Sequence, residues 1–188
     1  MTDISLQAAP HAEASDVKVW DPFVRFFHWA LVALFVVAFA TAEDYETAHL
    51  AAGYAILALV LARIVWGFVG PAHARFRGFV FAPRETLRFM ADTARLKARR
   101  YLGHNPAGGL MVVALMAMML AITATGIMQT LDVFADAEWV EEIHEGAVFA
   151  TLGLIGLHLL GVLVASIEHR ENLVRSMITG RKRPLDQA

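Results

Sequence analysis

Cysteine is absent from the 188 residues of this chain. This absence excludes disulfide bonds, iron–sulfur clusters and covalently attached c-type haem, because all three depend on thiols. It leaves the redox compartment open. The sequence also lacks an excess of positive charge, since the formal net charge is −2 at pH 7. Surfaces that bind nucleic acids are strongly basic, so we expect no nucleic-acid partner.

A polar stripe is missing from each of the four long apolar runs of the chain. Hydrophobic residues make up 57% of the sequence, more than is usual in a soluble domain. A soluble helical bundle would need a polar face on every helix, whereas a membrane span needs about 20 mostly apolar residues. The sequence therefore predicts an all-α, transmembrane four-helix bundle. The predicted spans are residues 23–42, 49–69, 106–128 and 143–167.

The N-terminal segment is not expected to be a secretory signal. The first apolar run follows a polar tail over residues 1–16, exceeds the length of a signal-peptide core and lacks a convincing small-residue cleavage site. We expect residues 1–16 to be flexible, residues 17–183 to form the membrane domain, and residues 184–188 to form a C-terminal tail.

Lysine and arginine are absent from two of the connections between the spans. Residues 42–48 and 129–142 contain acidic residues but no basic ones. The connection at 70–105 contains eight lysines and arginines, and the segment after Ile167 contains five. Connections rich in lysine and arginine remain on the cytoplasmic side. Both termini are therefore predicted to be cytoplasmic, with two short acidic loops outside.

The long basic connection carries its own helical pattern. After Pro83, the residues Leu87, Met90, Ala91 and Ala94 recur at helical spacing among basic residues. This pattern predicts a short amphipathic helix on the inner leaflet; a solvated basic linker helix is the alternative. Asn105, followed by proline, is predicted to cap the third span.

Four of the eight histidines lie in or at the spans, where ionisable residues indicate function. His49 and His144 open the second and fourth spans at the outer side. His28 and His158 lie deeper, toward the inner side. The other histidines with inner-side positions, including His104, are expected to be solvated.

The spacing of His144 and His158 places both on one helix face. They are fourteen residues apart, which corresponds to about 21 Å along the axis and about 40° around it. Matching by depth gives two stacked pairs, His49 with His144 and His28 with His158. A pair of neutral imidazoles suits the two axial positions of a b-type haem better than zinc, which takes three or four ligands. The alternative is that each histidine is a surface or hydrogen-bonded residue.

One arginine lies within the second apolar run. Arg63 is fourteen residues after His49, so it shares a similar face near the inner pair. An arginine at this depth needs an anionic partner, such as a haem propionate or a group at a quinone site, or it must extend to the inner headgroups. Arg63 is therefore a cofactor-binding candidate, and we expect a quinone site near it and the turn at 103–109.

Several segments in order resemble one family, the bacterial cytochrome b561 and nickel–iron hydrogenase cytochrome b-subunit family. The similarity covers nearly all of residues 17–183. Its segments are VKVWDPFVRFFHW (17–29), HLAAGYAILALVLARIVWGFVG (49–70), GHNPAGGLMVV (103–113), WVEEIHE (139–145), GLH (156–158) and EHRENLVRSMITGRKR (168–183).

The resemblance implies a four-helix bundle with two non-covalent b-type haems. By position, His49 and His144 would be axial ligands of the outer haem iron, and His28 and His158 of the inner one. It further implies electron transfer between the quinone pool and a periplasmic redox protein, such as a c-type cytochrome or a hydrogenase, in the bacterial inner membrane. Two alternatives stay open: a stand-alone superoxide or quinol oxidoreductase, and a membrane anchor subunit without haem.

Overall fold

The computed structural model describes residues 16–185, and four of its helices are long and apolar enough to span a membrane. They are α1 (Pro22–Ala40), α2 (Glu46–Val69), α4 (Pro106–Gln129) and α5 (Glu138–Glu168). Only 11–28% of each apolar stretch is buried inside the protein, as expected for helices whose solvent is lipid. The predicted transmembrane four-helix bundle is confirmed. Residues 1–15 and 186–188, which include most of the predicted N-terminal tail, lie outside the described residues.

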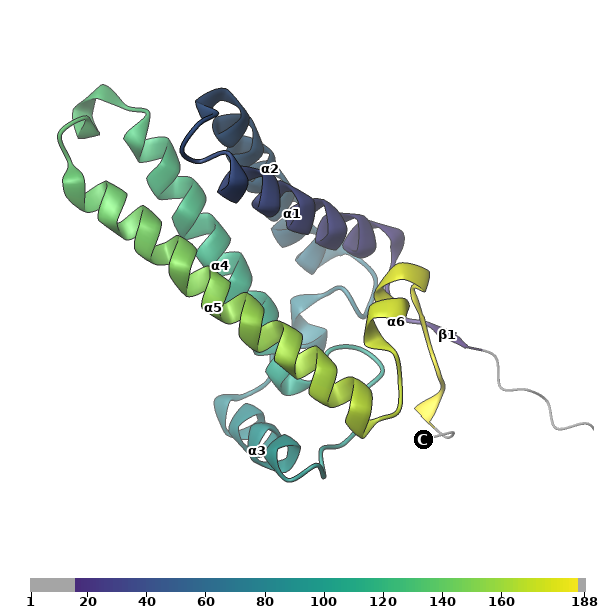
Figure 1. The fold of residues 1–188 in the computed structure, drawn as a ribbon. Coiled ribbons are helices and arrows are strands. Elements are labelled where there is room, and N and C mark those ends of the chain that lie inside the picture. Colours follow the sequence, from purple (N-terminus) through teal and green to yellow (C-terminus); the bar gives the residue numbers. More distant parts are fainter. Residues whose placement is uncertain (1–15, 186–188) are drawn as a thin grey trace, which may run out of the picture.

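The bundle consists of two antiparallel helix hairpins (Figure 1). Helix α1 packs along α2, α4 packs along α5, and α2 packs along α4 to join the hairpins. Helices α1 and α5 are not among the extensively packed pairs of the described residues. The core where α1, α2 and α4 meet consists of Phe27, Ile56, Val60, Met116 and Met119.

Helix boundaries follow local capping chemistry. The Asp21 side chain accepts hydrogen bonds from the amides of Phe23 and Val24, so α1 begins at Pro22. The Asn105 side chain accepts one from the Gly108 amide, which confirms the predicted cap of α4. Helix α5 begins five residues before the predicted span because Glu138 and Glu141 in its first turn favour a helix N-terminus.

The two ends of the bundle differ in charge. We call the end formed by the start of α1, residues 70–105 and the chain after Glu168 the basic end. The opposite end, with the turns at 41–45 and 130–137, is the acidic end. The acidic end includes a 3-10 turn, η2 (Asp132–Phe134), and the basic end includes another, η1 (Phe76–Gly78).

The predicted amphipathic helix is present as α3 (Pro83–Ala94), which packs against α4 at the basic end. Its inward face uses Thr86 and Phe89, which are buried. Leu87 and Met90, which we predicted on the membrane-facing side, are exposed. Phe89 is thus the anchor of this helix, and the apolar pair beside it is left free to contact lipid.

The C-terminal segment folds back onto the basic end, which the sequence did not predict. Strand β1 (Val17–Lys18) pairs antiparallel with β2 (Arg181–Lys182), and the short helix α6 (Leu173–Thr179) precedes β2 (Figure 1). Gly180 ends α6 in the left-handed conformation, with φ of 80°, and its carbonyl accepts hydrogen bonds from the amides of Val19 and Trp20.

A buried ionic network fixes this segment to the basic connection. Glu171 accepts a hydrogen bond from Arg100 at 2.9 Å and lies 3.5 Å from the ammonium of Lys182. Arg100 also donates to the carbonyls of Arg183 and Pro184, and Lys182 donates to the carbonyl of Tyr101. All three charged side chains of the network are at most 9% exposed.

Candidate functional site

The structure brings the four span histidines together as two pairs that bridge the hairpins. The ring centroids of His49 and His144 are 6.2 Å apart, and those of His28 and His158 are 6.4 Å apart. Each pair joins the α1–α2 hairpin to α5. Since His144 and His158 are fourteen residues apart on one helix, the pairs lie at two depths. Among residues 16–185 no third histidine, cysteine, aspartate or glutamate joins either pair, so each is a two-ligand set.

These separations fit a metal bound between two imidazoles. Two rings that bind one iron from opposite sides, each through a nitrogen at about 2 Å, have their centroids about 6 Å apart. Two glycines leave space beside the pairs. A Cβ added at Gly53, one turn after His49, would have no atom within 4 Å apart from its chain neighbours and its own helix backbone, and the same holds for Gly161, three residues after His158. Both features suit a flat macrocycle.

The pair near the acidic end, His49 and His144, is held in one tautomer by its neighbours. The Nδ1 atom of His49 lies 2.8 Å from the Ala38 carbonyl oxygen, which can only accept, so Nδ1 carries the proton. The Nδ1 atom of His144 lies 3.1 Å from Thr125 Oγ1, whose own proton is donated to the Ala121 carbonyl at 2.8 Å. Both histidines therefore keep the lone pair of Nε2 free for a ligand role.

Thr125 and Gly126 of α4 were not predicted as part of the site. A Cβ at Gly126 would lie 3.2 Å from the His144 ring, so this glycine leaves room for the imidazole. The signal is present in the sequence, because these residues lie near the acidic end of their span, at the depth of His144.

Arg63 is enclosed by protein at the basic end. Its side chain is 2% exposed, its guanidinium lies over the rings of Phe76 and Phe79, and Nη2 donates to the Ala74 carbonyl at 3.1 Å. The alternative in which Arg63 extends to the headgroups is therefore wrong, because the loop at 71–79 covers it. Nη1 is buried with no hydrogen-bond partner within the described part of the chain.

His104 is not solvated, contrary to the prediction. Its ring lies between Trp20 and Phe79, with centroid distances of 4.7 Å to each, and its Nδ1 is buried without a partner among residues 16–185. Burial, with the nearby charges of Arg63 and Lys182, lowers the pKa of His104 to about 3. The sequence pattern missed this because the two surrounding aromatic residues come from separate segments, both distant in sequence from His104.

His104 is expected to make the folded protein sensitive to acid. The pKa of His104 is about 3 in the folded protein and near 6.5 in the unfolded chain. Between these two pH values the unfolded chain binds a proton at His104 and the folded protein does not. Stability from this position is thus lost as pH falls from about 6.5 toward 3. His104→Phe keeps the aromatic packing, so its acid-unfolding midpoint should lie roughly one pH unit lower than that of the wild type. An unchanged midpoint, with unchanged stability at pH 7.5, would contradict this position of His104.

Comparison with known proteins places the chain in one family. The family model for prokaryotic cytochrome b561 matches residues 19–180. The chain is similar to a probable Ni/Fe-hydrogenase B-type cytochrome subunit of Bradyrhizobium diazoefficiens, with 25% identity over 88% of this chain and 85% of that protein. Similar proteins with the same description occur in Rhizobium leguminosarum bv. viciae, with 20% identity over 90% of both chains, and in Azotobacter chroococcum mcd 1, with 23% identity over 87% of both. No solved structure matches the chain.

The family model matches nearly all of the membrane domain, which has four membrane-spanning helices and paired histidines within the bundle. The chain therefore belongs to the prokaryotic cytochrome b561 family and is a multi-pass membrane cytochrome b of electron transfer that uses b-type haem.

Proposed function

We propose that this protein carries electrons through two b-type haems between the quinone pool and a redox protein at the acidic end. The observation that supports it most strongly is the pair of bis-histidine arrangements at two depths, with ring centroids 6.2 and 6.4 Å apart. His49 and His144 would hold the haem near the acidic end, and His28 and His158 the haem near the basic end. When bound, haem supplies one-electron redox chemistry at its iron.

The remaining groups of the site would position and tune the haems. Ala38 and Thr125 orient the imidazoles of the pair near the acidic end through their Nδ1 atoms. The buried Nη1 of Arg63 is a donor without a partner among the described residues, so it suits a propionate of the haem near the basic end. This role would offset the cost of burying a guanidinium.

Orientation follows from charge. The basic end would face the cytoplasm, together with both chain termini, because lysine and arginine concentrate there. The acidic end would then face the periplasm of a bacterial inner membrane. Its connections at 42–48 and 129–142 contain eight acidic residues and no basic ones, and all eight are exposed.

The charge of the acidic end favours a basic protein partner. Complementary charge speeds the encounter of two proteins, and like charge slows it. A basic c-type cytochrome or the basic face of a hydrogenase would be attracted, and the names of the relatives make a hydrogenase a candidate. Superoxide is an anion that these carboxylates repel, so the stand-alone superoxide oxidoreductase is the weaker alternative.

Proteoliposomes test the proposal. The haem-loaded protein is reconstituted with a short-chain quinol in the lipid, and a basic c-type cytochrome is supplied outside. We expect quinol-dependent reduction of that cytochrome, at least 10-fold above protein-free vesicles, which falls steeply between about 20 and 500 mM salt. A rate equal to that of protein-free vesicles would contradict transmembrane electron transfer. A rate that salt does not change would contradict docking at the acidic end.

Thr125 offers a test of the ligand assignment. Thr125→Val removes the acceptor of the His144 Nδ1 proton while it keeps the side-chain shape, so the imidazole becomes a weaker electron donor. We expect the potential of one haem to rise by an amount on the order of tens of millivolts, with two haems retained. Thr123→Val is the matched control, because Thr123 donates only to carbonyls of its own helix. Equal potentials in both variants would contradict the role of His144.

A further inference from the structure

The two histidine pairs differ in what contacts their Nδ1 atoms. Near the acidic end, Nδ1 of His49 donates to the Ala38 carbonyl at 2.8 Å, and Nδ1 of His144 donates to Thr125 Oγ1 at 3.1 Å. Near the basic end, Nδ1 of His28 is buried and has no hydrogen-bond partner within the described part of the chain. Both rings of the first pair are therefore hydrogen-bonded at Nδ1, whereas the second pair includes a ring that is not.

This difference has a consequence for the electron affinity of a bound iron. A hydrogen bond donated by Nδ1 raises the basicity of the ligating nitrogen on the same ring. A more basic ligand stabilises ferric iron over ferrous iron and so lowers the reduction potential. Hydrogen bonding alone thus favours a lower potential for the haem that His49 and His144 would hold.

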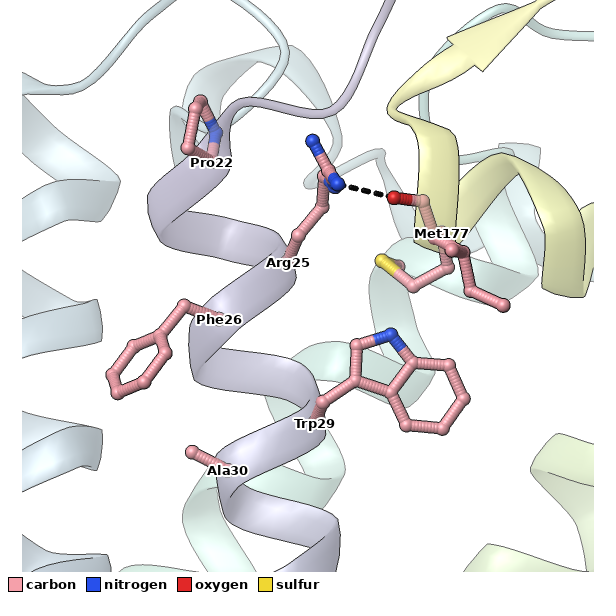
Figure 2. Close-up of a pocket in the computed structure, with 7 residues that line it drawn as sticks. Pro22, Arg25, Phe26, Trp29, Ala30 and Met177 are labelled. Carbon is pink, nitrogen blue, oxygen red and sulfur yellow. Dashed lines mark hydrogen bonds between the residues drawn. The ribbon is translucent and has the colours of Figure 1, made fainter.

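A fixed positive charge lies beside the pair near the basic end. Arg25 is three residues before His28 on α1, so the two side chains are neighbours on one helix face. The guanidinium of Arg25 reaches toward α6, where its Nη2 donates to the Ile178 carbonyl (Figure 2). Its Nε is buried. Reduction removes one positive charge from the iron, so a nearby cation favours the ferrous state and raises the potential.

Arg63 places a second positive charge at a similar depth. The rings of Phe23 on α1 and Trp66 on α2 are 4.8 Å apart, which sets the register of the two antiparallel helices. From this contact toward the acidic end, His28 is five residues along α1 and Arg63 three residues along α2. Their backbones therefore differ in depth by only about 3 Å. Arg63 is 2% exposed, so water and salt screen its charge weakly.

Charge at the other end of the bundle has the opposite sign. The connections at 42–48 and 129–142 contain eight acidic residues and no basic ones. Negative charge stabilises ferric iron and lowers the potential of a haem beside it. These carboxylates are exposed and therefore more strongly screened than the two arginines, but their effect has the same sense as the hydrogen bonds of the nearer pair.

We infer that the two haems have different reduction potentials in a fixed order: the haem held by His49 and His144 has the lower potential, and the haem held by His28 and His158 has the higher one. The inference rests on the proposed two-haem function and adds to it the residues that tune each haem. Thr125 lowers one potential, and Arg25 and Arg63 raise the other. At equilibrium, a single electron shared by the two haems should reside near the basic end at least 10-fold more often, which corresponds to about 59 mV.

Redox titration of the haem-loaded protein tests the order. The wild type should show two potentials. The haem left in His158→Ala should titrate near the lower of them, and the haem left in His49→Ala near the higher. Each variant removes a ligand of one pair only, so the haem that remains identifies its own potential.

Two further variants test the tuning residues with both haems in place. Thr125→Val should raise the lower potential and leave the higher one unchanged. Arg25→Gln removes a charge and keeps a hydrogen-bond donor, so it should lower the higher potential and leave the lower one unchanged. Each should reduce the 10-fold preference at least 3-fold. The matched controls are Thr123→Val, whose hydroxyl donates only within its own helix, and Arg77→Gln, an exposed arginine; neither should shift either potential.

Two haems with the reverse order of potentials, or with one common potential, would overturn the inference and leave the proposed function standing. If a histidine variant loses both haems, Thr125→Val and Arg25→Gln decide, and a shift of the wrong potential or of neither would overturn the inference. A wild-type chain with fewer than two haems would contradict the proposed function, and the inference would fail with it.

Discussion

Replacing His158 by alanine is expected to lower the haem content from two per chain to one. His158 and His28 are the pair near the basic end, with centroids 6.4 Å apart, so the variant leaves His28 as a single ligand. The pair near the acidic end keeps both of its histidines and both of its tautomer-fixing contacts. The measurement is the reduced-minus-oxidised spectrum of purified protein, with haem quantified per chain.

The matched control is His169→Ala, since His169 lies at the end of the same helix but in neither pair. It should keep two haems. His49→Ala should also leave one haem, and its spectrum and potential should differ from those of the haem left by His158→Ala, because the two variants remove different sites. Two haems retained in His158→Ala would contradict the pairing.

Replacing Glu171 by alanine is expected to lower the free energy of unfolding more than any other substitution proposed for this protein. This carboxylate is 8% exposed and is the only acidic partner of Arg100 and Lys182 among the salt bridges of the described residues. Removal of one partner of a buried ion pair strands the remaining charge, which costs about 3–5 kcal/mol. For a chain of this size the melting temperature should fall by roughly 10 °C.

Haem absorbance during thermal unfolding in detergent measures this effect. Glu85→Ala, an exposed position on α3, is the control and should change the melting temperature by no more than about 2 °C. A Glu171→Ala protein as stable as this control would show that the C-terminal segment is not fixed by the network.

The same network predicts the pH dependence of this segment. Burial opposes ionisation of Glu171, but the hydrogen bond from Arg100, the charge of Lys182 and the amide of Arg183 outweigh it, so the pKa of Glu171 is lowered. Burial also lowers the pKa of Lys182, whose contact with Glu171 is the longer one, so Arg100 is the dominant partner. Since the folded pKa of Glu171 lies below its ordinary value, its contribution to stability is present above that value and is lost as pH falls through the folded pKa.

The sequence was most informative where one-dimensional rules apply. Apolar length set the four spans, and the Asn105–Pro106 cap followed from the residues themselves. Helical periodicity placed His144 and His158 on one face, and the structure brings each close to the histidine with which depth had matched it.

The sequence was least informative where distant segments meet. The cage around His104 combines Trp20 with Phe79, and the network around Glu171 combines the chain just after α5 and strand β2 with the basic connection. Neither has a periodic signal, because each partner comes from a separate loop or terminus. The sequence predicted how far along its span Arg63 lies, but not what surrounds its side chain. The guanidinium is covered by the irregular loop at 71–79, which has no periodic pattern.

The first measurement is the haem stoichiometry of the wild-type chain, purified from cells supplied with haem and shown to be folded. We expect two b-type haems per chain, with two resolvable potentials in a redox titration, because in the proposed function each histidine pair would hold one. A folded chain without haem, or with a single haem in saturating supply, would contradict the two-haem relay on which the proposed function rests.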